Sequence, residues 1–355
     1  MNQCPDQLSA PKPPKPLSSS QTPQHTYKAE DLNSSSQAMY PTDAEESLVT
    51  IVALPAYVML RIFSFLCIPE RIRISRVCKL WKMLVEDFSL WRHVDLTSMM
   101  VKAPVARHLF QRYLGSGLQS LSLGGYLISG LNGVKYTPVL IKEVGRRCPH
   151  LTRLEVHIAF LRTLPITKLP QSLRSLELHS CEISRTWLLE ESDFSPLPFL
   201  QHLVLDCVPA FNDRQLKALS RLKALCSLEL VGLPLVSDEG LMVALTEVNG
   251  LYNLKVVNCS FSADGLLQAV GQHLQKLQKL IISVKGLTTK GLSQLERMDS
   301  LQYLELNGPF TRKDFLSTTH ILSVGLKMPR LHTFKLLEST PQTRGMSRPW
   351  LISGK

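Results

Sequence analysis

Three histidines recur at nearly equal spacing in the middle of the chain, and their side chains suit metal chemistry. His157, His179 and His202 are separated by 22 and 23 residues. Neutral imidazole is the most common metal ligand among protein side chains. A zinc site also needs a defined ligand spacing and acidic groups that orient the imidazoles. We find no such spacing and expect no acidic group beside the histidines, so the sequence predicts no metal and no cofactor.

Motifs for bond-making chemistry are missing from the sequence. It has no G-x-S-x-G, Walker or H-E-x-x-H pattern, so no nucleophile elbow, phosphate-binding loop or zinc-protease helix is predicted. Gly124 and Gly125 follow an expected strand, but no phosphate-binding pattern continues from them. We therefore predict no catalytic residue and a function that is not enzymatic.

The cysteines and the hydropathy pattern bear on the compartment. The eight cysteines form no C-x-x-C pair, and several lie in apolar runs, where a thiol packs as a small hydrophobe in a reducing compartment. No signal-peptide core and no run of about 18 apolar residues is found. We expect a protein of the cytoplasm, the nucleus or both, with no membrane partner.

The charge balance is basic, at a formal net charge of +11. Such an excess is compatible with nucleic acid, a membrane surface or an acidic protein as partner. No DNA- or RNA-binding signature accompanies it. We expect protein partners and no nucleic acid, and keep a nucleic-acid-binding protein as an alternative.

Two regions of different amino-acid composition occupy residues 1–47 and 48–90. Residues 1–47 are rich in Pro and Ser and are predicted to be a disordered tail. Residues 48–90 are predicted to be two or three helices, because Leu60, Phe63 and Leu66 share one helical stripe. The polar positions between the apolar ones are basic from Arg71 to Lys82, and we expect them to face solvent or a partner. So small a unit cannot bury all its apolar residues by itself.

From residue 91 onwards one hexad, Leu-x-x-Leu-x-Leu or a close apolar variant, recurs ten times. It begins at Trp91, Leu118, Leu151, Leu173, Leu200, Leu225, Leu251, Leu277, Leu301 and Leu331. A leucine-rich repeat usually spans roughly 20–29 residues, and most of these starts are separated by that interval. We predict an α/β fold, in which a leucine-rich-repeat solenoid over residues 91–337 has parallel strands on its concave side and helices on its convex side. Residues 338–355 contain no further hexad and are predicted to be an irregular tail.

Strand positions between the inward leucines face the concave side. Acidic and histidine residues gather there in the first half of the repeats, and the predicted target-binding set is Glu155, Glu177, His179, His202 and Glu229. One hypothesis is that they bind a basic or mixed-charge segment of a target. An ordinary solvated strand face explains them equally well, because exposed strand positions must be polar.

The helical segment LPAYVMLRIFSFLCIPERIRISRVCKLWKMLVEDFSLWRHVDL resembles an F-box. The matching positions are Leu54-Pro55, Ile62-Phe63, Leu66, Pro69, Val77-Cys78, Trp81, Leu84 and Leu90-Trp91. Together with the repeats, residues 50–337 resemble the F-box/leucine-rich-repeat family. Trp81 and Trp91 are expected to pack internally and at the junction with the first repeat.

The resemblance implies a substrate receptor of a Skp–cullin–F-box E3 ubiquitin ligase. The F-box would bind the Skp adaptor, which links it to a cullin and a RING subunit, and the repeats would hold target proteins for ubiquitination and proteasomal degradation. Carried over by position, the adaptor-binding residues would be Leu54, Pro55, Leu60, Ile62, Phe63 and Leu66. A leucine-rich-repeat scaffold without a ligase link is the other alternative.

Overall fold

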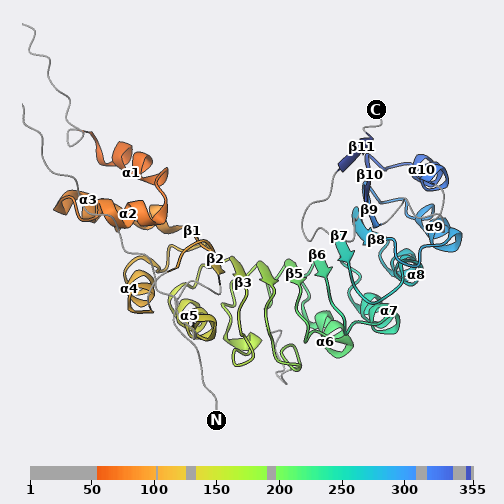
Figure 1. Cartoon of the computed structure of the whole chain (residues 1–355), viewed down its shortest axis with the longest axis horizontal. Coiled ribbons are helices and arrows are strands. Elements are labelled where there is room, and N and C mark those ends of the chain that lie inside the picture. Colours follow the sequence, from red (N-terminus) through yellow and green to blue (C-terminus); the bar gives the residue numbers. More distant parts are fainter. Residues whose placement is uncertain are drawn as a thin grey trace, which may run out of the picture. The chain divides into compact units, whose positions relative to one another are not determined.

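The structure is a computed structural model that describes residues 54–100, 103–124, 133–189, 197–308, 318–338 and 349–352. A short helical cluster is followed by a long sheet that carries helices on one side (Figure 1). The predicted tail, residues 1–47, and the first residues of the predicted cluster lie outside the described part of the chain. Among the described residues, no helix has both the length and the apolar composition that a membrane span requires.

The helical cluster consists of α1 (Ala56–Ser64), α2 (Ile68–Ile74), α3 (Lys79–Val85) and the 3₁₀ turn η2 (Phe88–Trp91). A cap defines the start of α2, because the Glu70 carboxylate accepts the backbone N–H of Cys67 at 2.9 Å. Such a reciprocal cap satisfies N–H groups that have no partner within the helix. Both α1 and α2 pack against α3.

Aromatic side chains hold the cluster together and join it to the repeats. Phe63 is 2% exposed and meets Trp81 edge to face, with ring centroids 5.2 Å apart. Trp91 donates its Nε1–H to the carbonyl of Val85 at 2.6 Å and stacks on Tyr113 at 4.4 Å. Tyr113 belongs to the first helix of the repeat region. The predicted packing roles of Trp81 and Trp91 are confirmed.

Arg71 corrects the expectation that the basic positions of α2 face solvent or a partner. Its guanidinium donates to the carbonyls of Phe63 at 3.2 Å, Ser64 at 2.9 Å and Leu90. Desolvation by burial lowers the pKa of this guanidinium, which nevertheless stays charged. Arg71 therefore connects the end of α1 to η2 from within the cluster.

The ten hexads coincide with ten parallel strands in one sheet, so the predicted α/β repeat fold is confirmed. The strands run in sequence order, with each paired to the next in register, as in Leu203↔Leu228↔Leu254. Their bounds are β1 His93–Leu96, β2 Ser120–Gly124, β3 Arg153–His157, β4 Ser175–His179, β5 His202–Asp206, β6 Ser227–Val231, β7 Asn253–Val257, β8 Lys279–Ser283, β9 Tyr303–Gly308 and β10 Thr333–Glu338. The inward leucines of neighbouring repeats stack into one continuous apolar core.

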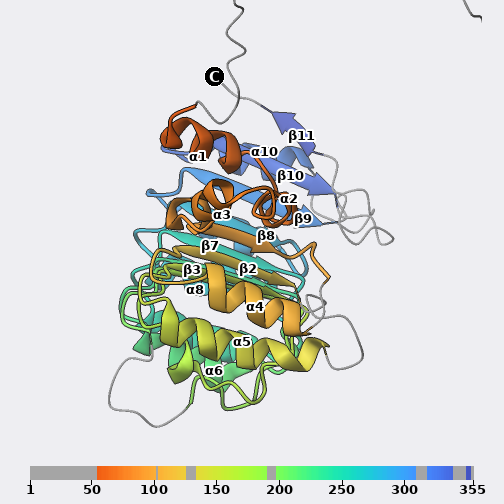
Figure 2. The same ribbon diagram turned by 90° about the vertical axis from the view of Figure 1, so that its left-hand side faces the viewer.

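Helices return the chain in most connections between strands and cover one face of the sheet (Figure 1), whereas the β3–β4 connection has only the 3₁₀ turn η3 (Ile166–Lys168). They are α4 Ala103–Tyr113, α5 Gly133–Arg147, α6 Asp213–Ala218, α7 Asp238–Glu247, α8 Ala263–His273, α9 Thr289–Leu295 and α10 Thr318–Lys327. Figure 2 shows α4 and α5 side by side, and Arg147 joins them by donating to the carbonyls of Phe110 and Gln111. The opposite face of the strands is left uncovered by these helices.

A ladder of carboxylates links the starts of successive helices. Asp213 accepts both the N–H and the O–H of Ser237 at 2.8 and 2.7 Å, and Asp238 accepts those of Ser262 in the next repeat. Each serine in turn caps its own helix by accepting a glycine N–H. At Gly240 a Cβ atom would lie only 2.1 Å from Asp213, so the link requires glycine at this position.

The end of the chain differs from the predicted irregular tail. Pro349–Ile352 forms a strand, β11, that pairs antiparallel with β10. A strand at the end of a repeat stack gives hydrogen-bond partners to an otherwise unpaired edge. The sequence did not indicate this strand, because a single four-residue segment without a hexad carries no repeat signal.

Candidate protein-binding surfaces

The helical cluster carries an unusual number of exposed apolar side chains. They are Tyr57 (74% exposed), Ile62, Phe65 (73%), Val77, Leu80, Met83 and Phe88. Most surround α1 and α3, which pack against each other. Isolated exposed apolar residues are normal, but a concentration of them indicates a surface for another protein.

The six residues predicted to contact an adaptor fall into three groups. Pro55 and Ile62 are exposed, and Leu54, Leu60 and Leu66 are half-buried against the cluster's core. Phe63 is almost completely buried. Its place in the predicted set is corrected, because packing against Trp81 leaves its ring no surface to offer.

Tyr57 and Phe65 were missed by the sequence prediction. On α1 the buried stripe runs through Met59 and Phe63, one helical turn apart. Tyr57 and Phe65 each lie two residues from that stripe, which places them about 200° around the helix, on its opposite side. Tyr57 and Phe65 form a second apolar stripe on a short helix, and this stripe could have indicated a binding surface from the sequence.

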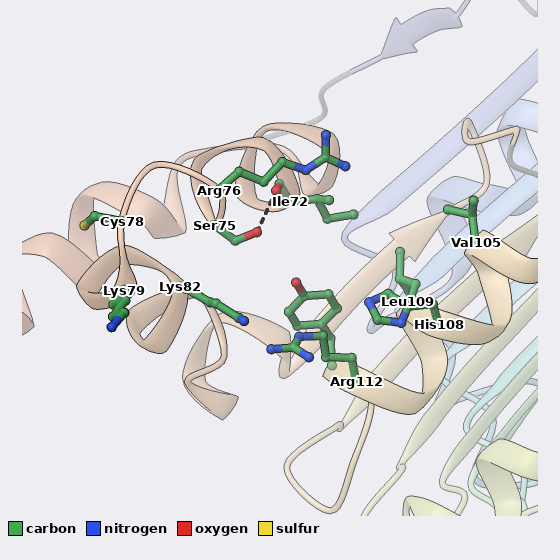
Figure 3. Close-up of a pocket in the computed structure, with 11 residues that line it drawn as sticks. Ile72, Ser75, Arg76, Cys78, Lys79, Lys82, Val105, His108, Leu109 and Arg112 are labelled. Carbon is green, nitrogen blue, oxygen red and sulfur yellow. Dashed lines mark hydrogen bonds between the residues drawn. The ribbon is translucent and has the colours of Figure 1, made fainter.

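A basic pocket of about 840 Å³ lies between α2, α3 and α4 (Figure 3). Ile72 and Leu109 supply part of its apolar lining, and Lys82 and Arg112 extend toward its open space from α3 and α4. Arg112 also forms an ion pair with Glu86. The pocket can accept a group that is partly apolar and negatively charged.

The uncovered strand face aligns the predicted target-binding residues as the sequence indicated. Glu155, Glu177, Val204, Glu229 and Lys255 occupy equivalent positions on five adjacent strands. A pocket of about 660 Å³ on this face is lined by Glu177, His179, His202 and Glu229, among others. Four of the five predicted residues therefore share one pocket, and Glu155 lies beside it on β3.

The carboxylates of this face have cationic partners, which sequence reasoning did not assign. Arg153 contacts Glu177 at 2.9 Å, and Lys255 contacts Glu229 at 3.1 Å. These ion pairs are partly exposed, so each contributes little to stability. The face therefore offers charges of both signs, which suits a mixed-charge segment better than a purely basic one.

Two histidines and three carboxylates meet at this pocket, which His179, Glu177 and Asp206 help to line. The rings of His157 and His179 stack with centroids 4.5 Å apart and planes 10° apart. His157 Nε2 lies 2.7 Å from Glu155, and His179 Nδ1 lies 3.2 Å from Asp206. The expectation that no acidic group accompanies the histidines is therefore wrong. His202, one strand further on, is exposed and lies outside this group.

Hydrogen bonds and charge shift the pKa values in this group. The Glu177 carboxylate, followed by Asp206, raises the pKa of His179. The same contact with His179, together with the nearby Arg153, lowers the pKa of Glu177. Both shifts favour the charged forms of the pair.

Comparison with known proteins adds the family. Residues 51–97 match the F-box-like family model. Over 289 residues, the chain is 47% identical to human F-box/LRR-repeat protein 12, a match that covers 81% of this chain and 89% of the human protein. The chain belongs to the F-box/LRR-repeat family. The cattle and mouse forms of F-box/LRR-repeat protein 12 match over the same shares, at 47% and 46% identity.

Two solved structures are also similar in part. An internalin of Listeria monocytogenes covers 64% of this chain and 58% of its own, with 17% identity and a TM-score of 0.39. Human trophoblast glycoprotein covers 60% of this chain and 79% of its own, with 17% identity and a TM-score of 0.34.

In this F-box/LRR-repeat protein, the F-box is the helical cluster and the repeats form the sheet. Membership of the family indicates a substrate-adaptor role rather than an enzymatic one. The F-box implies binding to a Skp-type adaptor, and the leucine-rich-repeat fold implies binding to proteins.

Proposed function

We propose that this protein is the substrate-recognition subunit of a Skp–cullin–F-box E3 ubiquitin ligase. The F-box would bind the Skp adaptor, which connects it to a cullin and a RING subunit. The strand face would hold target proteins for ubiquitination and proteasomal degradation, in the cytoplasm, the nucleus or both. The subunit itself would form no covalent bond. It would act by holding a target near a ubiquitin-loaded conjugating enzyme, which raises the effective concentration of the target.

The exposed apolar side chains of the F-box are the observation that carries the proposal. Tyr57 and Phe65 are each about three-quarters exposed, on a unit whose described residues form four short helical segments. Aromatic residues contribute most of the binding energy in many protein interfaces. A surface of this kind is stabilised when a partner removes it from water.

The adaptor interaction is tested by pull-down of the purified protein with a Skp adaptor. We expect Tyr57→Ser with Phe65→Ser to weaken binding at least about tenfold, since truncating an interface aromatic commonly costs more than 1.4 kcal/mol. Replacing Leu54 and Pro55 by alanine should act in the same direction. Phe199→Ser is the matched control, because Phe199 is 56% exposed on the repeats.

The outcome separates the ligase receptor from its alternatives. Retention of the adaptor by the Tyr57→Ser, Phe65→Ser variant would remove this surface from the proposal. If the wild-type protein does not bind Skp adaptors, the result would indicate the alternative of a leucine-rich-repeat scaffold without a ligase link. Salt-sensitive retention on DNA without an adaptor complex would indicate the nucleic-acid alternative.

Target binding on the strand face is tested in cells with the proteasome inhibited. We expect Glu177→Lys with Glu229→Lys to lose captured targets while keeping the adaptor, because the reversal places like charges beside Arg153 and Lys255. The F-box variant should show the opposite result. Unchanged target capture by the charge-reversed protein would exclude the strand-face hypothesis.

A further inference from the structure

Three donor groups converge at one point on the strand face. The potential ligand atoms of Glu155, His157 and His179 all lie within 4.8 Å of one another. His157 and His179 are register partners on the adjacent strands β3 and β4, and Glu155 lies two residues before His157 on the same face. The parallel pairing therefore brings together side chains that are 22 residues apart in the sequence.

The spacing of these donors suits one small metal ion after a modest adjustment. Zinc binds imidazole nitrogen and carboxylate oxygen at roughly 2.0–2.2 Å, so tetrahedral ligand atoms lie about 3.3 Å apart. The observed donors lie on both sides of this value, from 2.7 Å between His157 Nε2 and Glu155 up to a limit of 4.8 Å. Their side chains are between 22% and 34% exposed, so rotation about the side-chain bonds can close the difference. The two rings are stacked with centroids 4.5 Å apart and planes 10° apart, so one ring must turn about its side-chain bonds before both nitrogens can bind the same ion.

A carboxylate behind one imidazole gives the site an outer shell. Asp206 lies 3.2 Å from Nδ1 of His179. A proton on Nδ1 that is shared with this carboxylate leaves a lone pair on Nε2 of His179, 3.9 Å from Glu177, as the ligand for an ion. Metal-bound histidines usually have such a partner on their second nitrogen, which fixes the tautomer and raises ligand basicity.

The local charge also favours a divalent cation. Three carboxylates, those of Glu155, Glu177 and Asp206, surround the two imidazoles. Arg153 contributes one positive charge and lies closer to Glu177, at 2.9 Å, than to Glu155, at 3.9 Å. With neutral imidazoles the group carries a net charge of about −2, which one divalent ion neutralises.

We propose that Glu155, His157 and His179 bind a zinc ion, with Asp206 as the positioning residue for His179. Imidazole and carboxylate ligands suit zinc better than calcium or magnesium, which prefer oxygen ligands alone. Three protein ligands leave a fourth position for water or for a donor group of a bound protein. The site does not depend on the ligase function, because it needs no part of the F-box.

The site is tested by titrating zinc into the full-length protein, with calorimetry as the readout. We expect one ion per chain at this site, and His157→Gln with His179→Gln should remove that binding event. Asp206→Asn should weaken it by about 10- to 100-fold, as loss of an outer-shell partner does. His202→Gln is the matched control and should bind zinc like the wild type, because His202 lies outside the donor group.

Cobalt substitution distinguishes this site from zinc bound by thiols. We expect visible bands of a nitrogen- and oxygen-ligated cobalt ion that disappear in the double histidine variant. An intense thiolate charge-transfer band, or equal zinc binding by that variant, would assign the metal to other residues and overturn the proposal. Absence of zinc binding by the wild type would overturn it as well. Thermal unfolding of each variant without metal shows that the substitutions leave the fold intact.

Discussion

The F-box and the repeats use apolar residues in opposite ways. In the repeats, the strand leucines Leu203, Leu205, Leu228 and Leu230 are at most 1% exposed, and the other face of β5 and β6 is mostly polar. In the F-box, a small core around Phe63 and Trp91 leaves Tyr57, Phe65 and other large apolar side chains in water. The difference shows that the repeats complete their core by stacking on each other, whereas the F-box has apolar surface left for a partner.

The largest expected effect is on the core of the repeats. Leu228→Ala in β6 should lower the free energy of unfolding by about 2–5 kcal/mol, because the side chain is 1% exposed and its removal leaves a cavity. Phe65→Ser should change it by only about 0.5 kcal/mol, as at other exposed sites. Urea unfolding followed by circular dichroism measures both. Equal losses for the two variants would contradict the contrast between the regions.

Thiol reactivity should next separate the exposed cysteines of the F-box from the buried cysteines of the repeat core. Burial raises the pKa of Cys148 and Cys181 from the ordinary 9.0 to about 11, so at pH 8 each forms about 100-fold less of the reactive thiolate. Cys67 and Cys78 of the F-box are exposed. Iodoacetamide labelling followed by mass spectrometry should modify the F-box pair before Cys148 and Cys181. Early labelling of Cys181 in the folded protein would show that its repeat opens.

Arg71 tests how much polar contacts contribute to the small core of the F-box. Arg71→Met should destabilise the protein by about 2 kcal/mol, because three carbonyls lose their donor. Arg71→Lys should recover only part of this loss, since an ammonium lacks the planar fork of a guanidinium. Thermal unfolding compares the two variants. A fully stable Arg71→Met protein would mean that these bonds are replaceable by water.

The carboxylate ladder of the repeats should give a smaller effect. Gly240→Ala should cost about 1–2 kcal/mol, because the new methyl group would displace Asp213 from its bonds to Ser237. Gly250→Ala is the matched control, since the nearest atom to its Cβ would be 3.7 Å away. Chemical unfolding of both variants decides whether the close approach matters.

The smallest effect is expected at a strained residue beside the histidines. Ile158 has a φ of 53°, a region that disfavours branched side chains and tolerates asparagine. Ile158→Asn should therefore stabilise the protein by about 0.5–1 kcal/mol. Ile158→Val keeps the branched side chain and serves as the control. A loss of stability in the asparagine variant would show that the packing of Ile158 outweighs the strain.

The order of the elements was predictable because both regions carry periodic patterns. The hexads indicated every strand from β1 to β10, and the stripe through Leu60 and Phe63 indicated α1. β11 carried no such pattern. No pattern indicated that Arg71 donates to backbone carbonyls either. A sequence pattern reports which side of an element is apolar, but it does not report which polar groups meet across elements.

The amino-acid sequence determined the repeat fold, the register of the strand face and the resemblance of the helical segment to an F-box, because these follow from local spacing. Only the tertiary structure decided which apolar side of α1 is buried and that Asp206 flanks the stacked pair of His157 and His179. The physical reason is that these contacts join residues from different turns or strands. Their distances are set by packing between elements rather than by position along the chain.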